Sequence, residues 1–277
     1  MQFTLDGHAV CGATGGRPHA AGRPLAVFVH GAGCNHTVWA LQSRWLAFRG
    51  WNVLALDLPG HGRSAGPPLR GIRVMARWLA SVIGAMESKS AALIGHSMGA
   101  LIALETAAHF PERVQSLALI ASAAAMPVQA DLLAASAADA RAAIDMVNHW
   151  GYGYAAGLGG SRAPGIWMVG AGERMLAASR PGVLHADLAA CNGYADGTAA
   201  AKQIAAPALL ICGEHDRMIP LRGGRALAAK IRGSTCVVLP GAGHMLMAER
   251  PEEVRAALAA HLKPHLKTHR AAPVHDF

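Results

Sequence analysis

The chain has 277 residues, of which 52% are hydrophobic and 15% are charged, and its formal charge is +8 at pH 7. This length suits one α/β core that carries an insertion. The sequence contains no span of about 18 uninterrupted apolar residues, the length that a membrane helix needs, so we expect no membrane partner. The basic residues are scattered and are not interleaved with aromatic residues, so we expect no nucleic-acid partner either.

The ends of the chain and its cysteines bear on location and metal content. The first residues, MQFTLDGHAVCG, lack the basic start and apolar middle of a secretory signal, so we expect a cytoplasmic protein.

The five cysteines are odd in number and form no C-x-x-C pair, which predicts free thiols and neither a disulfide framework nor a zinc site. His261, His265 and His269 recur every four residues, but Pro264 interrupts that helical face. We therefore expect a frayed C-terminus and no metal site there.

Six short and nearly continuous apolar runs predict strands that are buried on both faces of a parallel sheet. In chain order the runs are LAVFVHG (25–31), NVLALDLPG (52–60), AALIGHS (91–97), SLALIAS (116–122), ALLICGEHD (208–216) and TCVVLPGAGH (235–244). Candidate helices lie between and after these runs, over residues 37–49, 70–87, 98–109, 222–231 and 251–262. Right-handed crossovers would place the helices on both faces of the sheet, which defines an α/β fold.

The alternation of strand and helix patterns stops between Ala123 and Lys202. This stretch contains an alanine-rich helical pattern over 129–148, the glycine-rich run GYGYAAGLGG, and further helical pattern as far as Cys191. A structureless loop of this length inside a domain would be unusual, so the stretch predicts a helical cap. The glycine run follows no strand and is interpreted as a cap loop, not as a phosphate cradle. We expect a core formed by residues 1–122 and 203–277, with a cap at 123–202.

A serine stands between two glycines where a predicted strand meets a predicted helix. The pentapeptide Gly95-His96-Ser97-Met98-Gly99 has the pattern G-x-S-x-G, and its place between strand and helix makes the match informative. A turn this sharp strains the serine backbone and leaves room only for glycine two residues to either side. The turn would lift the hydroxyl above the sheet, at the N-terminal end of the next helix. Ser97 is the predicted nucleophile.

A serine nucleophile needs a base, and the base needs an acid that orients it. His244 follows the last predicted strand and Asp216 follows the strand before it, so the chain order is Ser, Asp, His. Both positions lie at carboxyl ends of strands, where open α/β sheets place their chemistry. Glu214 is close enough in sequence to compete with Asp216 for the role of the acid.

A pocket for an oxyanion would need two backbone amides. The first is expected from Met98, directly after the nucleophile, and the second from Ala32 in the loop after the first predicted strand, with Gly33 as an alternative. His30 is expected to fix this loop through hydrogen bonds, and His96 to be structural or to line the pocket.

Taken together, these motifs resemble the α/β-hydrolase fold superfamily. The segments that carry the resemblance are HGAGCNHTVW (30–39), DLPGHGRS (57–64), GHSMG (95–99), GEHD (213–216) and GAGH (241–244), on both sides of the predicted cap. The resemblance implies an α/β-hydrolase fold, with a mostly parallel central sheet flanked by helices and an inserted helical cap. It also implies that Asp57, His61 and Ser64 are structural.

By this resemblance, Ser97 attacks a carbonyl, His244 transfers the proton, Asp216 orients His244, and the amides of Met98 and Ala32 hold the oxyanion. The predicted function is a serine esterase that acts on a small, mostly apolar carboxylic ester, with neither a metal nor a cofactor. The same triad would also suit a carbon–carbon bond hydrolase, a lactonase, an amidase or iminopeptidase, an acyltransferase or a perhydrolase. A weakly hydrolytic ligand receptor of the same fold is a further alternative, and the sequence leaves the oligomeric state open.

An apolar substrate pocket is expected beneath the cap. Its candidate lining residues are aromatic or methionine side chains of the cap and of the loops beside it, namely Trp39, Met126, Trp150, Trp167, Met168 and Met245. Ordinary core packing is an equally good interpretation of each of them. Cys34 is expected near the site without acting in it.

Overall fold

The computed structural model describes residues 1–162, 165 and 167–268. In this part of the chain, eight strands form one sheet with the order β1-β2-β4-β3-β5-β6-β7-β8. The strands are β1 (Gln2–Leu5), β2 (His8–Ala13), β3 (Leu25–Val29), β4 (Asn52–Leu56), β5 (Ala91–His96), β6 (Val114–Ile120), β7 (Ala208–Gly213) and β8 (Thr235–Leu239). From β4 to β8 all neighbours are parallel, as predicted, while β1 and β2 pair antiparallel at one edge.

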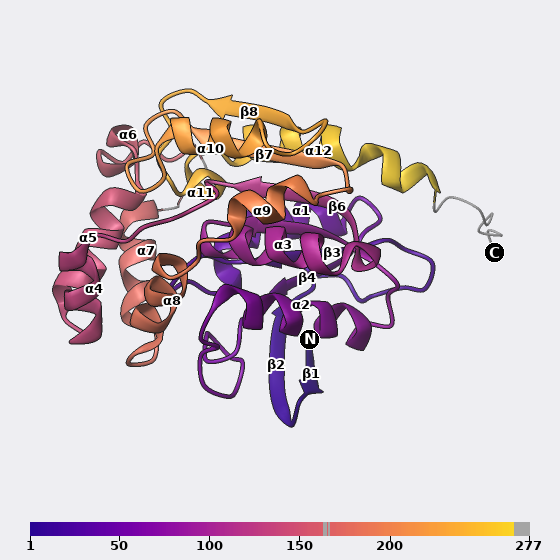
Figure 1. Ribbon diagram of the computed structural model, residues 1–277, viewed down its shortest axis with the longest axis horizontal. Coiled ribbons are helices and arrows are strands. Elements are labelled where there is room, and N and C mark those ends of the chain that lie inside the picture. The colour runs from indigo at the N-terminus through magenta and orange to yellow at the C-terminus, as the bar shows by residue number, and fades with distance from the viewer. Residues whose placement is uncertain (163–164, 166, 269–277) are drawn as a thin grey trace.

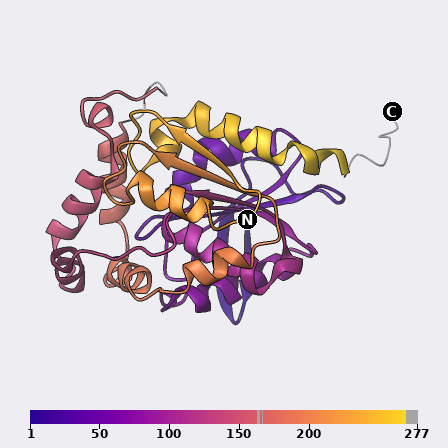
Figure 2. The same ribbon diagram turned by 45° about the horizontal axis from the view of Figure 1, so that its top comes forward.

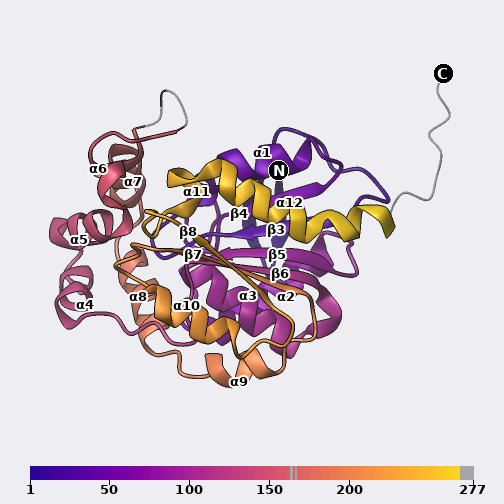
Figure 3. The ribbon, with the colours of Figure 1, turned by 90° about the horizontal axis from the view of Figure 1, so that it is seen from above.

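Helices cover both faces of the sheet, because alternate residues of its central strands point to opposite sides. Val27 and Val29 of β3 join a core cluster with α2 and α3, whereas Ala26 and Phe28 join a second cluster with α1 and α12. Figure 3 shows these two layers on either side of the strands. The core helices are η1 (His36–Trp39), α1 (Ala40–Ala47), α2 (Ile72–Ala85), α3 (Met98–His109), η2 (Pro111–Arg113), α10 (Leu221–Ala228), α11 (Leu246–Glu249) and α12 (Pro251–Thr268).

In the segment between β6 and β7 the described residues form helices and connecting loops but no strand; we call residues 123–202 the insert. Its helices are α4 (Ala130–Ala137), α5 (Arg141–Gly151), α6 (Tyr154–Gly157), α7 (Met168–Ala177), α8 (Val183–Asn192) and α9 (Gly197–Lys202). Helices α4 to α8 gather at one end of the molecule, whereas α9 packs on the core helix α3 (Figures 1 and 2).

Three elements differ from the sequence expectation. The helix expected over 129–148 is two helices, because Asp139 adopts a left-handed conformation with φ of 48° and separates α4 from α5. Helix α12 continues through Pro264 to Thr268, so the expected interruption is absent, and His269 lies outside the described residues. The edge hairpin of β1 and β2 was not expected at all. None of the helices in the described ranges is both long enough and apolar enough to cross a bilayer.

Candidate active site

Ser97 lies at the sharp turn between β5 and α3. Its backbone has φ of 53° and ψ of −118°, a strained conformation for a residue with a side chain. A Cβ atom built on Gly95 would lie 2.2 Å from the carbonyl oxygen of Gly99, and one built on Gly99 would lie 2.2 Å from that of Val29. Because both contacts are with backbone atoms, a side chain at either position would force the backbone to move, so only glycine fits without strain. The turn thus has the geometry that the G-x-S-x-G pattern predicts.

His244 is hydrogen-bonded to Asp216 in the loops that follow β8 and β7. Its Nδ1 lies 2.8 Å from Oδ2 of Asp216, and both residues are buried. The other carboxylate oxygen, Oδ1, accepts hydrogen bonds from the amides of Met218 (2.9 Å) and Ile219 (2.8 Å). The competing acid, Glu214, faces elsewhere, since its Oε2 accepts from the amide of Gly241 at 2.9 Å. The structure therefore pairs the histidine with Asp216.

The loop after β3, residues 30–34 (the β3 loop), runs beside the serine turn. Its residue Gly31 lies so close to Ser97 that a Cβ atom on Gly31 would be 3.2 Å from the serine Cβ. The amide of Gly33 already donates a hydrogen bond, 2.8 Å long, to a buried carboxylate. Among the described residues no acceptor is found for the amide of Ala32, and Met98 begins helix α3, where an amide has no intrahelical acceptor. Ala32 and Met98 therefore have amides that can face a ligand.

His30 and His96 are buried and uncharged. His30 donates from Nδ1 to the carbonyl of Gly31 (2.9 Å) and accepts at Nε2 from the amide of Leu58 (3.2 Å), as its expected role in fixing the loop requires. Burial, together with nearby His61, lowers the pKa of His30 to about 4. Burial and the neighbouring His244 likewise hold the pKa of His96 well below its usual value. Neither histidine brings a positive charge beside His244.

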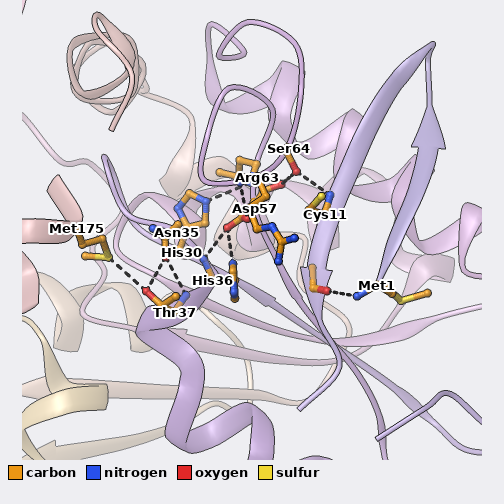
Figure 4. A network of polar contacts seen from close by, with 12 residues as sticks. Met1, Cys11, His30, Asn35, His36, Thr37, Asp57, Arg63, Ser64 and Met175 are labelled. Carbon is orange, nitrogen blue, oxygen red and sulfur yellow. Dashed lines mark hydrogen bonds and ion pairs between the residues drawn. The ribbon is translucent and has the colours of Figure 1, made fainter. Parts of the chain in front are cut away.

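Asp57 joins η1 to the segment that follows β4 (Figure 4). Its Oδ1 accepts from the amide and the ring Nδ1 of His36, each at 2.8 Å, and its Oδ2 accepts from the amide of Arg63 at 3.0 Å. Its backbone carbonyl accepts from the hydroxyl of Ser64. Burial works to raise the pKa of Asp57, but these hydrogen bonds outweigh it and lower the pKa. Asp57 and Ser64 thus have structural partners.

A carboxylate from the insert holds the other side of the β3 loop. Asp187 of α8 is fully buried, and its Oδ2 accepts from the amide of Gly33 at 2.8 Å and faces Nε2 of His61 at 2.7 Å. Nδ1 of His61 must donate, because its partner is the carbonyl of Pro59 at 3.0 Å. Burial works to lower the pKa of His61, but the charge and hydrogen bond of Asp187 outweigh it and raise the pKa. Both ring nitrogens of His61 thus face oxygen acceptors, an arrangement that favours a protonated ring beside the carboxylate.

The insert also contacts the loop after β8, residues 240–245 (the β8 loop). The carbonyl of Gly151 accepts from the amides of His244 (3.1 Å) and Met245 (2.9 Å). Buried Glu249 accepts, at one oxygen, from the amides of Gly153 and Gly243, both at 3.0 Å. The glycine-rich run that was interpreted as a cap loop is thus docked closely on the β8 loop.

Two cavities meet at Ser97, with volumes of about 40 Å³ and 130 Å³, and we call them the inner and the outer cavity. Ala32, Leu188 and Met218 also line both of them. His244 lines the inner cavity, together with residues of α5, α7 and α8, and none of its described lining residues is exposed. The outer cavity opens between exposed residues of the insert and of the loop after β7, such as Gln129 and Arg217.

The expected pocket residues divide into two groups. Met245 lines the inner cavity, and Met126 and Trp150 line the outer one. Cys34 also lines the inner cavity, where burial, with a smaller contribution from Asp187, raises the pKa of its thiol to about 12, so it is not a thiolate.

Three of the expected pocket residues lie elsewhere, which corrects that expectation. Trp39 is fully buried in the core, with its ring 5.2 Å from that of Phe28, because η1 turns it toward the sheet. Trp167 is 69% exposed. Met168 packs with Tyr152 in a small cluster and lines a separate groove beside α1.

Sequence reasoning missed Asp187, Glu249 and Asn148. One signal was available for Asp187, because it is the single acid in the mostly apolar helix α8, whose sequence is VLHADLAACN. A lone charge among apolar helical residues indicates either a buried partner or a functional site. No comparable signal marks Glu249 or Asn148.

Known proteins resemble this chain over most of its length. Residues 26–257 match the Alpha/beta hydrolase family. Over 261 residues the chain is 32% identical to the Pimeloyl-[acyl-carrier protein] methyl ester esterase of Chromobacterium violaceum, covering 87% of this chain and 94% of that protein. It is also 32% identical to the dihydrolipoyllysine-residue acetyltransferase component of the acetoin cleaving system of Pseudomonas putida, covering 88% of this chain. It spans only 64% of that protein's length.

Solved structures show the same architecture. The enol-lactonase from Burkholderia xenovorans LB400 superposes with a TM-score of 0.85 at 24% identity, covering 95% of this chain and all of that one. At this identity the likeness shows the fold alone. The eight-stranded sheet, the strained serine turn and the match over residues 26–257 all point to the same family. The chain belongs to the Alpha/beta hydrolase family.

Proposed function

We propose that the protein is a serine hydrolase that cleaves a small, mostly apolar carboxylic ester through an acyl-enzyme on Ser97. The observation that carries this proposal is the hydrogen bond of 2.8 Å between His244 and Asp216, on a cavity that Ser97 also lines. Relatives that are esterases, such as that of Chromobacterium violaceum, support it.

In the proposed mechanism, the hydroxyl oxygen of Ser97 attacks the carbonyl carbon of the ester. Nε2 of His244 takes the hydroxyl proton, because its Nδ1 is engaged by Asp216. The carboxylate stabilises the imidazolium that forms and keeps the ring in the correct tautomer. The amides of Met98 and Ala32 would hold the negative charge on the former carbonyl oxygen, since that of Gly33 is committed to Asp187.

Collapse of the tetrahedral intermediate releases the alcohol, which receives its proton from His244. Water then attacks the acyl-enzyme with His244 as the base, and the acid is released. Uncharged His96 favours this cycle, since a second positive charge beside His244 would oppose its protonation.

Labelling with a fluorophosphonate and hydrolysis of p-nitrophenyl esters of rising chain length test the proposal. We expect Ser97→Ala to abolish labelling and to lower turnover by about 10⁴-fold or more. Asp216→Asn should lower kcat by about 10⁴-fold, because the wrong imidazole tautomer would face the serine. Glu214→Gln is the matched control and should retain turnover.

Melting curves of each variant would separate loss of chemistry from loss of fold. Labelling without turnover by the natural protein would favour a ligand receptor over an enzyme. A Glu214→Gln variant more impaired than Asp216→Asn would contradict the assignment of the acid.

A further inference from the structure

Two residues that line the inner cavity each have a buried side-chain atom without a hydrogen-bond partner among the described residues, Nδ1 of His96 and Oδ1 of Asn148. Nδ1 of His96 lies against Gly31 and beside Ser97, whereas Asn148 lies on the insert. Asn148 of α5 is only 9% exposed, and its Nδ2 donates to the carbonyl of Val169 at 3.1 Å. This bond fixes the orientation of the amide, because a flipped amide would bring two acceptors together. Its Oδ1 is buried and accepts no hydrogen bond from any described residue. A buried acceptor without a donor is unfavourable, so a donor that reached Oδ1 from the cavity would be stabilising.

A second acceptor lies beside it. The hydroxyl of Tyr152 donates to the carbonyl of Met168 at 2.9 Å, so its proton is committed and only lone pairs remain on its oxygen. A Cβ atom on Gly172 would lie 2.6 Å from this oxygen and 2.7 Å from Oδ1 of Asn148. Gly172 and both oxygens therefore belong to one patch of the wall, and all three residues line the inner cavity.

The rest of the inner cavity favours a small neutral group. Most of its other lining residues are apolar, among them Val147, Leu176 and Leu184, and no lysine or arginine lines it among the described residues. A carboxylate placed here would lose its hydration and face the two acceptors without a cation. A volume of about 40 Å³ holds about three water-sized groups.

The two cavities are suited to different halves of an ester. The outer cavity is larger and has exposed residues at its rim, so a leaving alcohol can depart and water can enter there. The inner cavity has no exposed residue among those described, so it suits the acyl group that stays bound to Ser97.

We propose that the inner cavity binds a short acyl group that carries a hydroxyl or amide N–H, and that this group donates a hydrogen bond to Oδ1 of Asn148. This inference rests on the proposed function. It narrows the substrate class from small esters in general to esters of short acids with a neutral hydrogen-bond donor.

The test compares phenyl butanoate with phenyl 3-hydroxybutanoate, which differ by one hydroxyl group. We expect the natural protein to prefer the hydroxylated ester by about tenfold in kcat/KM. Asn148→Leu, of similar size but without the acceptor, should lower this preference by about tenfold. Val147→Ala is the matched control on the same helix; it enlarges the cavity without removing the acceptor and should leave the preference unchanged.

The two proposals fail in different ways. Equal kcat/KM values for the two esters, or a preference that Asn148→Leu and Val147→Ala change alike, would overturn the role of Asn148 while turnover itself persists. If neither ester is hydrolysed and Ser97 is not labelled by a fluorophosphonate, the proposed function fails instead. Melting curves of both variants identify any that do not fold.

Discussion

The serine turn and the two loops beside it are held in different ways. Ser97 is positioned by the core itself, since Gly95 and Gly99 allow β5, α3 and the end of β3 to touch backbone to backbone. The β3 loop and the β8 loop depend on the insert, through Asp187 in one case and the carbonyl of Gly151 in the other.

This difference shows that the insert has two structural roles. It lines both cavities at Ser97, and it also holds the loops that carry the proposed base and oxyanion amide. Damage to the serine turn should therefore affect folding and activity together. Damage to the contacts of the insert should reduce activity while the core stays folded.

The largest effect is expected at the serine turn. Gly99→Ala would place a Cβ atom 2.2 Å from the carbonyl oxygen of Val29. We expect the free energy of unfolding to fall by about 3 kcal/mol and turnover by at least about 100-fold, because the backbone must move. Gly84→Ala in α2 is the control, since a Cβ atom there meets nothing within 4 Å. Its stability should stay equal or rise by up to about 1 kcal/mol. Denaturant titration measures the stability of each variant, and ester turnover measures its activity. A Gly99→Ala variant as stable and active as Gly84→Ala would refute this prediction.

A smaller effect is expected at the anchor of the β3 loop. Asp187→Ala removes the acceptor of the Gly33 amide, so the loop and the amide of Ala32 should lose their positions. We expect kcat to fall by about 10- to 100-fold with little change in KM. Asp187→Asn keeps an acceptor oxygen and should recover part of the loss, and exposed Asp131→Ala is the matched control in the insert. A loss seen only in KM would show that Asp187 affects binding and not the proposed oxyanion amide.

The smallest effect is a dependence of stability on pH. The pKa of His61 is raised above its ordinary value of 6.5, chiefly because the carboxylate of Asp187 outweighs burial. The folded state therefore favours the charged ring, and the resulting stabilisation is complete below about pH 6.5 and is lost as pH rises through the folded pKa.

Glutamine can still donate a hydrogen bond to Asp187 but carries no charge. His61→Gln should therefore remove only the stabilisation that comes from the charge, which we expect to be about 1–2 kcal/mol at pH 6. The difference in melting temperature between the two proteins should shrink as pH rises. A difference that is constant from about pH 6 to 10 would mean that the ring is uncharged in the folded protein.

The parts of the site that depend on local backbone could be predicted from the sequence. The spacing of Gly95 and Gly99 around Ser97 reflects the turn itself, and Asp216 and His244 follow strands whose apolar runs are plain. The choice between Asp216 and Glu214 needed coordinates, because two residues of one loop differ only in the direction that they face.

Other parts could not be predicted, or their signals were weak. The edge hairpin turns at Asp6-Gly7, a favoured hairpin pair with positive φ at both residues, but its strands are short and β1 has no buried residue, so the apolar pattern is weak. The break at Asp139 has no glycine or proline to mark it. Asp187 meets Gly33 from 154 positions away in the chain, and no local pattern encodes so distant a contact.

The carboxylate of Asp187 also bears on protein engineering. Exchange of whole inserts between relatives is an obvious route to new substrate preferences, because the insert supplies much of the wall of both cavities. A transplanted insert that lacks an acid at the position of Asp187 would leave the Gly33 amide and the His61 ring without their acceptor. Such a chimera would need this single residue restored before its selectivity could be judged.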